Sequence, residues 1–335
     1  MNIRFAKYSD KSAILDFIDR YWAKDHIFVN WPELFDYTHL LNNGDLAYVI
    51  AEDEKDQKIY GVCGYIISNH LEHPDIWVAL WKVIPSGLPS LGMDLINFMK
   101  ENTKCRVFSC CGIKNSVKRI YNFLGFHTGT LNHFYRLADK EAYQVACVNQ
   151  KNIIPATPNK GCHLEEIKTK AQFEQIFNFE ILTRKKPYKD KDYLIHRYFE
   201  NIGYQYKIWT IMFDGSSVAN SVLIGREIRQ NNAVILRLVD FLGIDEELEQ
   251  IAVPLQKLIE TNGYEYIDMY EYGLKDETMY KMGMTKREKT DTNIIPNYFE
   301  PFVQENVDIH FFTNAEENFY MFKADGDQDR PNSRP

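Results

Sequence analysis

The sequence lacks any apolar stretch long enough to cross a membrane. A membrane-spanning helix needs about 20 consecutive apolar residues, whereas the most apolar stretches here, 76–85 and 233–243, have only the length of strands. The N-terminus also lacks the basic segment and the long apolar segment of a secretory signal peptide. We therefore expect a cytoplasmic protein with no membrane partner.

Cysteine is scarce and follows no pattern of a structural site. The 6 cysteines include no Cys-x-x-Cys pair and no Cys/His spacing typical of a metal centre. Cys110 and Cys111 are adjacent in sequence, which makes them a poor disulfide pair. Free thiols in a reducing compartment are the expected state, and we expect no metal cofactor.

Positive charge is also in short supply. Lys and Arg number 39 against 47 Asp and Glu, for a net charge of -8, which disfavours a protein that binds nucleic acid through its phosphates. The 17 Gly and 12 Pro are too few for a low-complexity chain. The 21 Tyr and 21 Phe supply ample core material, and 335 residues suffice for about two domains.

A linker predicted at 150–161 divides the chain into two parts, 1–161 and 162–335. The linker stretch has two prolines, little periodicity and a final glycine. Each part shows a similar order of helices, a hairpin and a long apolar strand. We expect an α/β (α+β) fold made of two tandem copies of one unit, each a mixed, mostly antiparallel sheet flanked by helices. Beyond residue 322 turn-forming and charged residues dominate, which predicts an exposed or loosely docked end.

A loop of small residues between a predicted strand, 76–85, and a predicted helix, 91–101, is typical of an anion site. Such a loop leaves several backbone N–H groups unpaired and pointing at one place, and the positive end of the helix dipole adds to their effect. The residues that would hold a pyrophosphate there are Gly87, Ser90, Leu91, Gly92 and Met93. An ordinary capped helix after a strand stays open as the alternative.

Two further stretches join this loop in a family resemblance. Asn115 opens the helix after the next strand, and 121–126 reads Tyr-Asn-Phe-Leu-Gly-Phe. Together with the loop, these stretches resemble the GNAT acyltransferase superfamily over residues 1–137, the last one through a Y-x-x-x-G-F pattern. The resemblance implies that the first part binds acyl-CoA through the loop and Asn115, and that Tyr121 protonates the departing thiolate. A half-buried tyrosine without a catalytic role is the alternative.

The second part has lost these signals. Its corresponding helix begins with acidic residues, 245–247, which would repel a pyrophosphate, and Met279 stands where the tyrosine would be. We expect this part to wall the acceptor pocket instead of binding acyl-CoA, because ligand sites favour domain interfaces.

Polar side chains within otherwise apolar strands of the second part are the acceptor candidates. We expect Asn220, Asp268, Glu271 and Tyr272 to meet an amine or sugar hydroxyls, and Arg184, Lys186 and Arg197 to meet a nucleotide pyrophosphate. Candidates for a proton-accepting group include Asp240 and His26. The alternatives are an Asp240 that caps a loop or pairs with Arg237, and a basic run that is only a solvated face.

A narrower resemblance rests on the tandem copies, the chain length and the segment 25–35. In these features the chain is similar to two-domain GNAT N-acyltransferases that use 3-hydroxybutyryl-CoA to acylate dTDP-linked 3-amino-3,6-dideoxyhexoses for bacterial O-antigen or capsule. The resemblance implies acyl-CoA as co-substrate, a dTDP-amino sugar as acceptor, direct attack in a ternary complex, and a monomer or weak dimer. An amino acid or aminoacyl-tRNA acceptor, and a non-catalytic binding module, remain open, as do the hexose epimer and the acyl chain.

Overall fold

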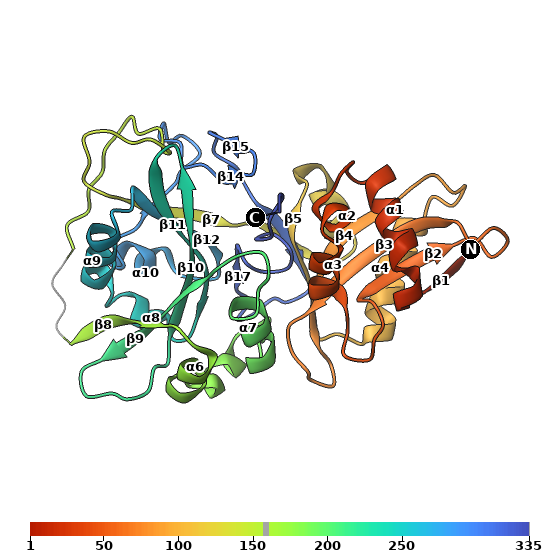
Figure 1. Cartoon of the computed structure of the whole chain (residues 1–335), viewed down its shortest axis with the longest axis horizontal. Helices are drawn as coiled ribbons and strands as arrows, with labels where there is room; N and C mark the ends of the chain where they lie inside the picture. The colour runs from red at the N-terminus through yellow and green to blue at the C-terminus, as the bar shows by residue number, and fades with distance from the viewer. Residues whose placement is uncertain (157–160, 335) are drawn as a thin grey trace.

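The computed structural model describes residues 1–156 and 161–334, and Figure 1 shows two lobes, each built on a sheet with helices packed against it. The expected α/β architecture with two sheets flanked by helices is confirmed. The predicted linker includes residues 157–160, which lie outside the described residues. No helix of the described chain has the length and apolarity that a membrane span requires.

The first sheet has seven strands in the order β1-β2-β3-β4-β5-β16-β6. Helices pack on it through apolar stripes at helical spacing, as in α1, which buries Ile14, Phe17 and Ile18. The strands are β1 (Asn2–Phe5), β2 (Tyr48–Glu52), β3 (Ile59–Ile67), β4 (Asp75–Val83), β5 (Val107–Ile113), β6 (His127–Thr130) and β16 (His310–Thr313). The helices are α1 (Lys11–Tyr21), α2 (Ile27–Asn30), α3 (Pro32–His39), α4 (Leu91–Thr103) and α5 (Lys118–Phe123), with 3-10 turns at Tyr8–Asp10 and Asn115–Val117.

The second sheet follows a related order, β13-β7-β12-β11-β10-β9-β8, with β17 paired to β12. Its strands are β7 (Asn132–Leu137), β8 (Cys162–Ile167), β9 (Lys207–Phe213), β10 (Val222–Gln230), β11 (Ala233–Leu242), β12 (Tyr266–Tyr272), β13 (Thr285–Lys286) and β17 (Met321–Phe322). Its helices are α6 (Lys170–Ile176), the 3-10 helix Phe179–Arg184, α7 (Lys191–Tyr198), α8 (Asp245–Leu248), α9 (Ala252–Asn262) and α10 (Asp276–Lys281). A small hairpin joins β14 (Tyr298–Phe299) and β15 (Phe302–Val303).

The two sheets exchange one strand each. β7 lies between β12 and β13 of the second sheet, where Figure 1 shows it in yellow, and β16 lies between β5 and β6 of the first. Only Leu131 separates β6 from β7. This one-residue connection is too short for a hairpin turn, which needs at least two residues, so β7 cannot fold back to pair with β6 in the first sheet. The two crossing segments meet where the N–H of Leu131 donates to the carbonyl of Ile309, at 2.8 Å. The sheets therefore do not separate at the expected boundary between 1–161 and 162–335.

Most of the chain beyond residue 322 is docked and not exposed, which corrects the expectation from its composition, whereas residues 332–334 are exposed. Lys323, Ala324, Asp325 and Asp329 are all buried. Ion pairs hold this segment, Lys323–Asn332 (hereafter the tail), because Lys189 meets Asp325 at 2.6 Å and Arg226 meets Asp329 at 2.9 Å. Charged residues suggest solvent exposure in a sequence, but here Asp325 and Asp329 find cationic partners in the second lobe.

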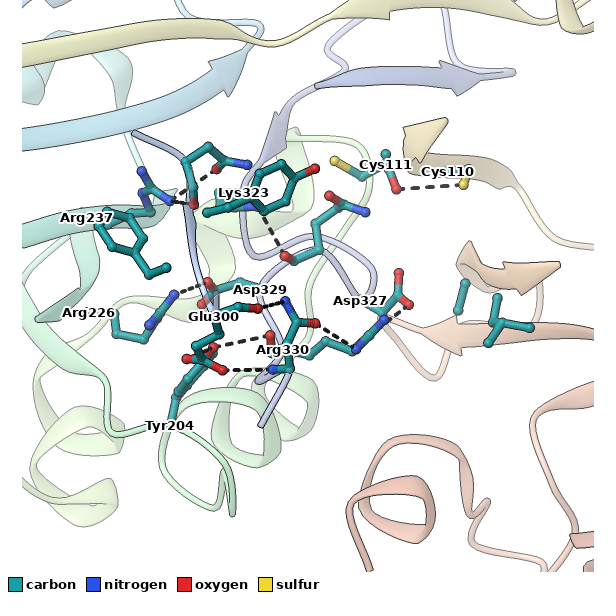
Figure 2. A pocket seen from close by; sticks show the side chains of 18 of the residues that line it. Cys110, Cys111, Tyr204, Arg226, Arg237, Glu300, Lys323, Asp327, Asp329 and Arg330 are labelled. Carbon is teal, nitrogen blue, oxygen red and sulfur yellow. Dashed lines mark hydrogen bonds and ion pairs between the residues drawn. The ribbon is translucent and has the colours of Figure 1, made fainter. Parts of the chain in front are cut away.

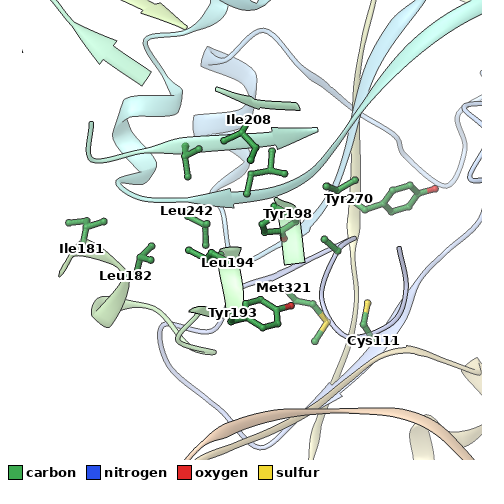
Figure 3. Close-up of a cluster of buried hydrophobic side chains, with 14 of the residues drawn as sticks. Cys111, Ile181, Leu182, Tyr193, Leu194, Tyr198, Ile208, Leu242, Tyr270 and Met321 are labelled. Atoms are coloured by element: carbon green, nitrogen blue, oxygen red, sulfur yellow. The ribbon is translucent and has the colours of Figure 1, made fainter. Parts of the chain in front are cut away.

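An apolar cluster joins the lobes beside the tail. It combines Trp77 and Cys111 of the first lobe with Tyr193, Tyr270 and Met321, and Figure 3 shows several of these side chains converging. Because burying apolar surface is the main favourable term in folding, this shared core fixes the two lobes against each other.

Candidate active site

The first sheet opens into a split between β4 and β5. These parallel strands pair only from Asp75–Val107 to Trp77–Ser109, and among the described residues no strand pairs with the rest of β4 on that side. The register against β3 also shifts, so that Gly64 faces both Ala79 and Leu80, and such a bulge bends the strand. An exposed strand edge can pair with an extended, amide-bearing chain.

The split leads to a cavity of about 220 Å³ between the lobes, shown in Figure 2. The first sheet contributes Ala79, Leu80 and Cys110–Gly112, while Tyr204, Arg226 and Arg237 come from the second lobe. The remaining wall is the tail together with 297–300 and Trp22. The residues that sequence reasoning missed include Tyr204, Arg226, Arg237, Glu300, Lys323 and Asp327. Charged residues inside apolar strands, Arg226 and Arg237, were the available signal.

The predicted anion loop has the expected local geometry. α4 starts at Leu91, whose N–H donates to Leu88 at 3.3 Å. Within the described chain no hydrogen bond engages the N–H groups of Ser90, Gly92 and Met93. Gly92 lies against Trp81, since a Cβ there would come within 3.1 Å of the indole ring. Gly87, by contrast, takes a positive φ of 77° at an exposed position with open space around it.

One feature of the loop opposes anion binding. The Ser90 hydroxyl donates to the carboxylate of Asp94 at 2.9 Å, which places a negative charge in the first turn of α4. Asn115, the other predicted cofactor residue, is exposed at the start of the 3-10 turn that precedes α5.

Tyr121 is buried on α5, at 4% exposure. Its ring stacks on Phe312 of the exchanged strand β16, with centroids 4.1 Å apart, and lies 6.2 Å from the ring of Trp81. Burial raises the pKa of the phenol well above its usual value, so Tyr121 keeps its proton at neutral pH. In the described chain no side chain or backbone group hydrogen-bonds to the hydroxyl.

The two predicted proton acceptors do not line the cavity. His26 caps α2 by accepting the N–H of Phe28 at 3.3 Å, and desolvation lowers its pKa to about 3. Asp240 is fully buried against Lys189 at 2.7 Å and the Tyr198 hydroxyl at 2.5 Å. We therefore do not retain either residue as the base, because each already compensates a buried group of the protein.

The predicted acceptor residues are also engaged elsewhere. Asp268 lies 2.6 Å from Arg237, which excludes the alternative pair of Arg237 with Asp240, and 3.0 Å from His133. Glu271 accepts from Asn132 at 2.9 Å, and burial raises its pKa to about 7.

Tyr272 and Asn220 likewise lie apart from the cavity between the lobes. The Tyr272 hydroxyl lies 3.2 Å from His127, beside a separate cavity of about 720 Å³. Asn220 accepts from Asn178 at 3.0 Å.

The basic residues proposed for a pyrophosphate are dispersed. Arg184 is exposed, and Lys186 borders another cavity, of about 300 Å³. Arg197 donates to the carbonyls of Ala324 at 3.2 Å and Asp329 at 2.9 Å, so it holds the tail. Within residues 1–156 and 161–334 no three His, Cys, Asp or Glu side chains are grouped to hold a metal ion.

The second sheet has a corresponding split, which the protein fills itself. β11 and β12 pair in parallel only from Leu236 to Leu238. Beyond that point β17 pairs with β12 at Glu271 and Tyr272, and the N–H of Ala324 donates to Val239 on β11 at 2.9 Å. The split of the second sheet is therefore occupied by the chain itself, and α8 beside it begins with acidic residues.

No family model matches the chain, and no curated protein matches its sequence. Among solved structures it is similar to a GCN5-related N-acetyltransferase from Anabaena variabilis, with a TM-score of 0.56 and 11% identity over 93% of this chain and 72% of that one. It is also similar to a conserved protein of unknown function from Enterococcus faecalis, described as a probable N-acyltransferase, with a TM-score of 0.59 and 9% identity over 93% and 71%. These likenesses identify the fold of the chain as that of the GCN5-related N-acetyltransferases.

Proposed function

We propose that this protein transfers an acyl group from acyl-CoA to an amine held between its lobes. The observation that carries the proposal is the open β4–β5 split, which leads directly into the cavity lined by both lobes. The equivalent split in the second lobe is filled by β17 and the tail. These observations support a donor site on the first lobe.

The parts of acyl-CoA fit the split in order. The free N–H groups of Ser90, Gly92 and Met93 would bind the pyrophosphate, and the open edge of β4 would pair with the amides of the extended arm. The thioester then lies near the bulge at Ala79 and Leu80, where the amine enters from the cavity. Tyr121, kept protonated by burial, would protonate the thiolate.

For the acceptor we propose a dTDP-linked 3-amino-3,6-dideoxyhexose. The cavity combines cations with aromatic rings, as at Arg226, which lies 3.8 Å from the ring centre of Tyr204. A second cavity of about 860 Å³ shares Tyr204, Arg226, Phe299 and Glu300 with it. A sugar in the first cavity and a nucleotide reaching the second would use both. The role would be acylation, with a 3-hydroxybutyryl or acetyl group, in making a bacterial surface polysaccharide.

A coupled assay tests the donor and the acceptor separately. Purified protein is mixed with acetyl-CoA or 3-hydroxybutyryl-CoA and a panel of dTDP-3-amino-3,6-dideoxyhexoses and amino acids, and free thiol and N-acyl products are measured. We expect an N-acyl product, and thiol release above a slow background of hydrolysis, with a dTDP-amino sugar only. Turnover with amino acids alone would contradict the proposal that the acceptor is a nucleotide sugar. Absence of thermal stabilisation by saturating CoA would contradict the proposed donor site.

The loop gives a sharper test of the donor site. Gly92→Val should crowd both the phosphate and Trp81, and weaken acyl-CoA binding by about 1–3 kcal/mol, as for lost buried hydrogen bonds. Asp94→Asn should instead strengthen acyl-CoA binding, because it removes a negative charge from the same turn. Calorimetric titration with CoA measures both. Wild-type affinity in Gly92→Val would place the pyrophosphate elsewhere.

A further inference from the structure

Acyl transfer to an amine needs a proton acceptor, and the cavity offers three carboxylates, Glu300, Asp327 and Asp329. Asp329 is engaged by Arg226 at 2.9 Å and by the Tyr206 hydroxyl at 2.9 Å, and these cationic surroundings lower its pKa to about 2. A carboxylate with so low a pKa is a poor base.

Glu300 is engaged as well. It accepts from the Tyr204 hydroxyl at 3.0 Å and from the backbone N–H of Asn332 at 2.8 Å. Its second carboxylate oxygen also accepts from the N–H of Ser333 at 3.2 Å. Both oxygens of Glu300 are therefore engaged, one by Tyr204 and the other by the end of the tail.

Asp327 differs from both. Among the described residues its side chain has one polar contact, with the Nε of Arg330 at 3.5 Å, and it is half-buried in the cavity wall. Figure 2 shows Asp327 beside Arg330, on the tail between the two lobes. Burial is the main cause of the raised pKa values of Cys110 and Tyr48, and the negative charge of Asp327 adds to it. Asp327 lines the same cavity as Ala79, Leu80 and Cys110 of the first sheet, where the split opens.

The position of Asp327 is fixed from both sides. Asp325 is anchored by Lys189 and Asp329 by Arg226, so the short loop between them has little freedom. The side chain of Gln328 docks on β5 at Gly112, where a Cβ would come within 1.9 Å of its amide nitrogen. A group held on both sides in this way is preorganised for contact with a bound acceptor.

We propose that Asp327 is the catalytic residue that accepts the proton of the acceptor amine. This inference rests on the proposed function. The nitrogen lone pair forms the C–N bond, the C–S bond breaks, and one nitrogen proton passes to the Asp327 carboxylate. The departing thiolate takes a proton from Tyr121. Exchange through solvent then returns the proton from Asp327 to Tyr121, so that both groups end as they began.

Other ionisable groups in the cavity bear on the pH dependence. They are Tyr204, Arg226, Arg237, Tyr298, Glu300, Lys323, Asp329 and Arg330, with Cys110 and Cys111 on the side of the first sheet. Lys323 is the competing base, because desolvation lowers its pKa to about 8. Its ammonium, however, donates to the carbonyl of Gln328 at 3.1 Å, which turns it toward the tail.

The test compares Asp327→Asn, Asp327→Glu and Lys323→Met, with Glu305→Gln as an exposed control. With acetyl-CoA and a dTDP-3-amino-3,6-dideoxyhexose, Asp327→Asn should lower kcat by about 10²-fold or more. The KM for acetyl-CoA should not change. The deficit should shrink as pH rises, because hydroxide can then take the nitrogen proton in place of the Asp327 carboxylate. Asp327→Glu should recover part of the rate, and Lys323→Met and Glu305→Gln should keep the pH profile.

Several results would overturn this role. One is a wild-type kcat in Asp327→Asn. Another is a pH-dependent loss of rate that occurs in Lys323→Met instead of Asp327→Asn. If Asp327→Asn does not fold, Asp327→Ser makes the same comparison with a smaller side chain. Slow hydrolysis of acetyl-CoA, in which water replaces the amine, is measured in parallel and should fall in the same variants. A wild type without either reaction overturns the proposal together with the proposed function, whereas normal aminolysis in Asp327→Asn overturns the proposal alone.

Discussion

A fragment of residues 1–161 is expected not to fold, although the sequence predicts it as a domain. It lacks β16, which fills the gap between β5 and β6 and brings Phe311 and Phe312, both fully buried, into the core. Losing a buried Phe costs about 3–5 kcal/mol, and two such losses approach the stability of a whole domain, about 5–15 kcal/mol. β7 cannot replace β16, because only Leu131 separates it from β6.

Circular dichroism and chemical denaturation of the fragment measure this effect. The matched control is the same fragment joined through a flexible linker to residues 306–316, which restores the missing strand. We expect a cooperative unfolding transition only with the added strand. A stable, cooperative fragment without it would show that the exchange is not needed for folding. If the fragment folds, its loss of turnover reports on the missing acceptor pocket. If it does not fold, the same loss of turnover reports only on stability.

Tyr121→Phe should lower kcat by about 10²-fold, the lower end of the range for general acid catalysis. A thiolate whose conjugate acid has a pKa of about 8.5 needs only modest help to leave. The variant keeps the ring that stacks on Phe312, so the melting temperature and the KM for acyl-CoA should stay unchanged. Because burial raises the pKa of Tyr121, the deficit should be constant at all pH values from about 6 to 9.

Steady-state kinetics across this pH range make the measurement, with Tyr280→Phe, an exposed tyrosine, as control. A Tyr121→Phe variant with kcat within about twofold of wild type throughout would show that the thiolate leaves without an acid. A lower melting temperature would instead point to a packing role for the hydroxyl. Parallel measurement on Asp327→Asn separates the two proton transfers, since only that deficit should shrink as pH rises.

Local patterns in the sequence predicted the elements that depend on neighbours along the chain. The helix expected at 91–101 appears as α4, Leu91–Thr103, because its apolar residues recur on one face. The small residues before it form the expected turn with unpaired N–H groups. The repeated order of elements likewise predicted two related sheets. Each of these features is set by residues a few positions apart.

Only the tertiary structure decided which strand completes each sheet and which residues reach the cavity. β7 and β16 have the patterns of ordinary buried strands, and nothing in their sequence indicates that they pair with the other half. The charged tail reads as a solvated end, yet Lys189, Arg197 and Arg226 bury it. Asp240 and Asp268, which look like site residues, turn out to neutralise buried cations. The physical reason is that the cost of burying a charge depends on partners that are distant in sequence, so its role is set by the folded contacts.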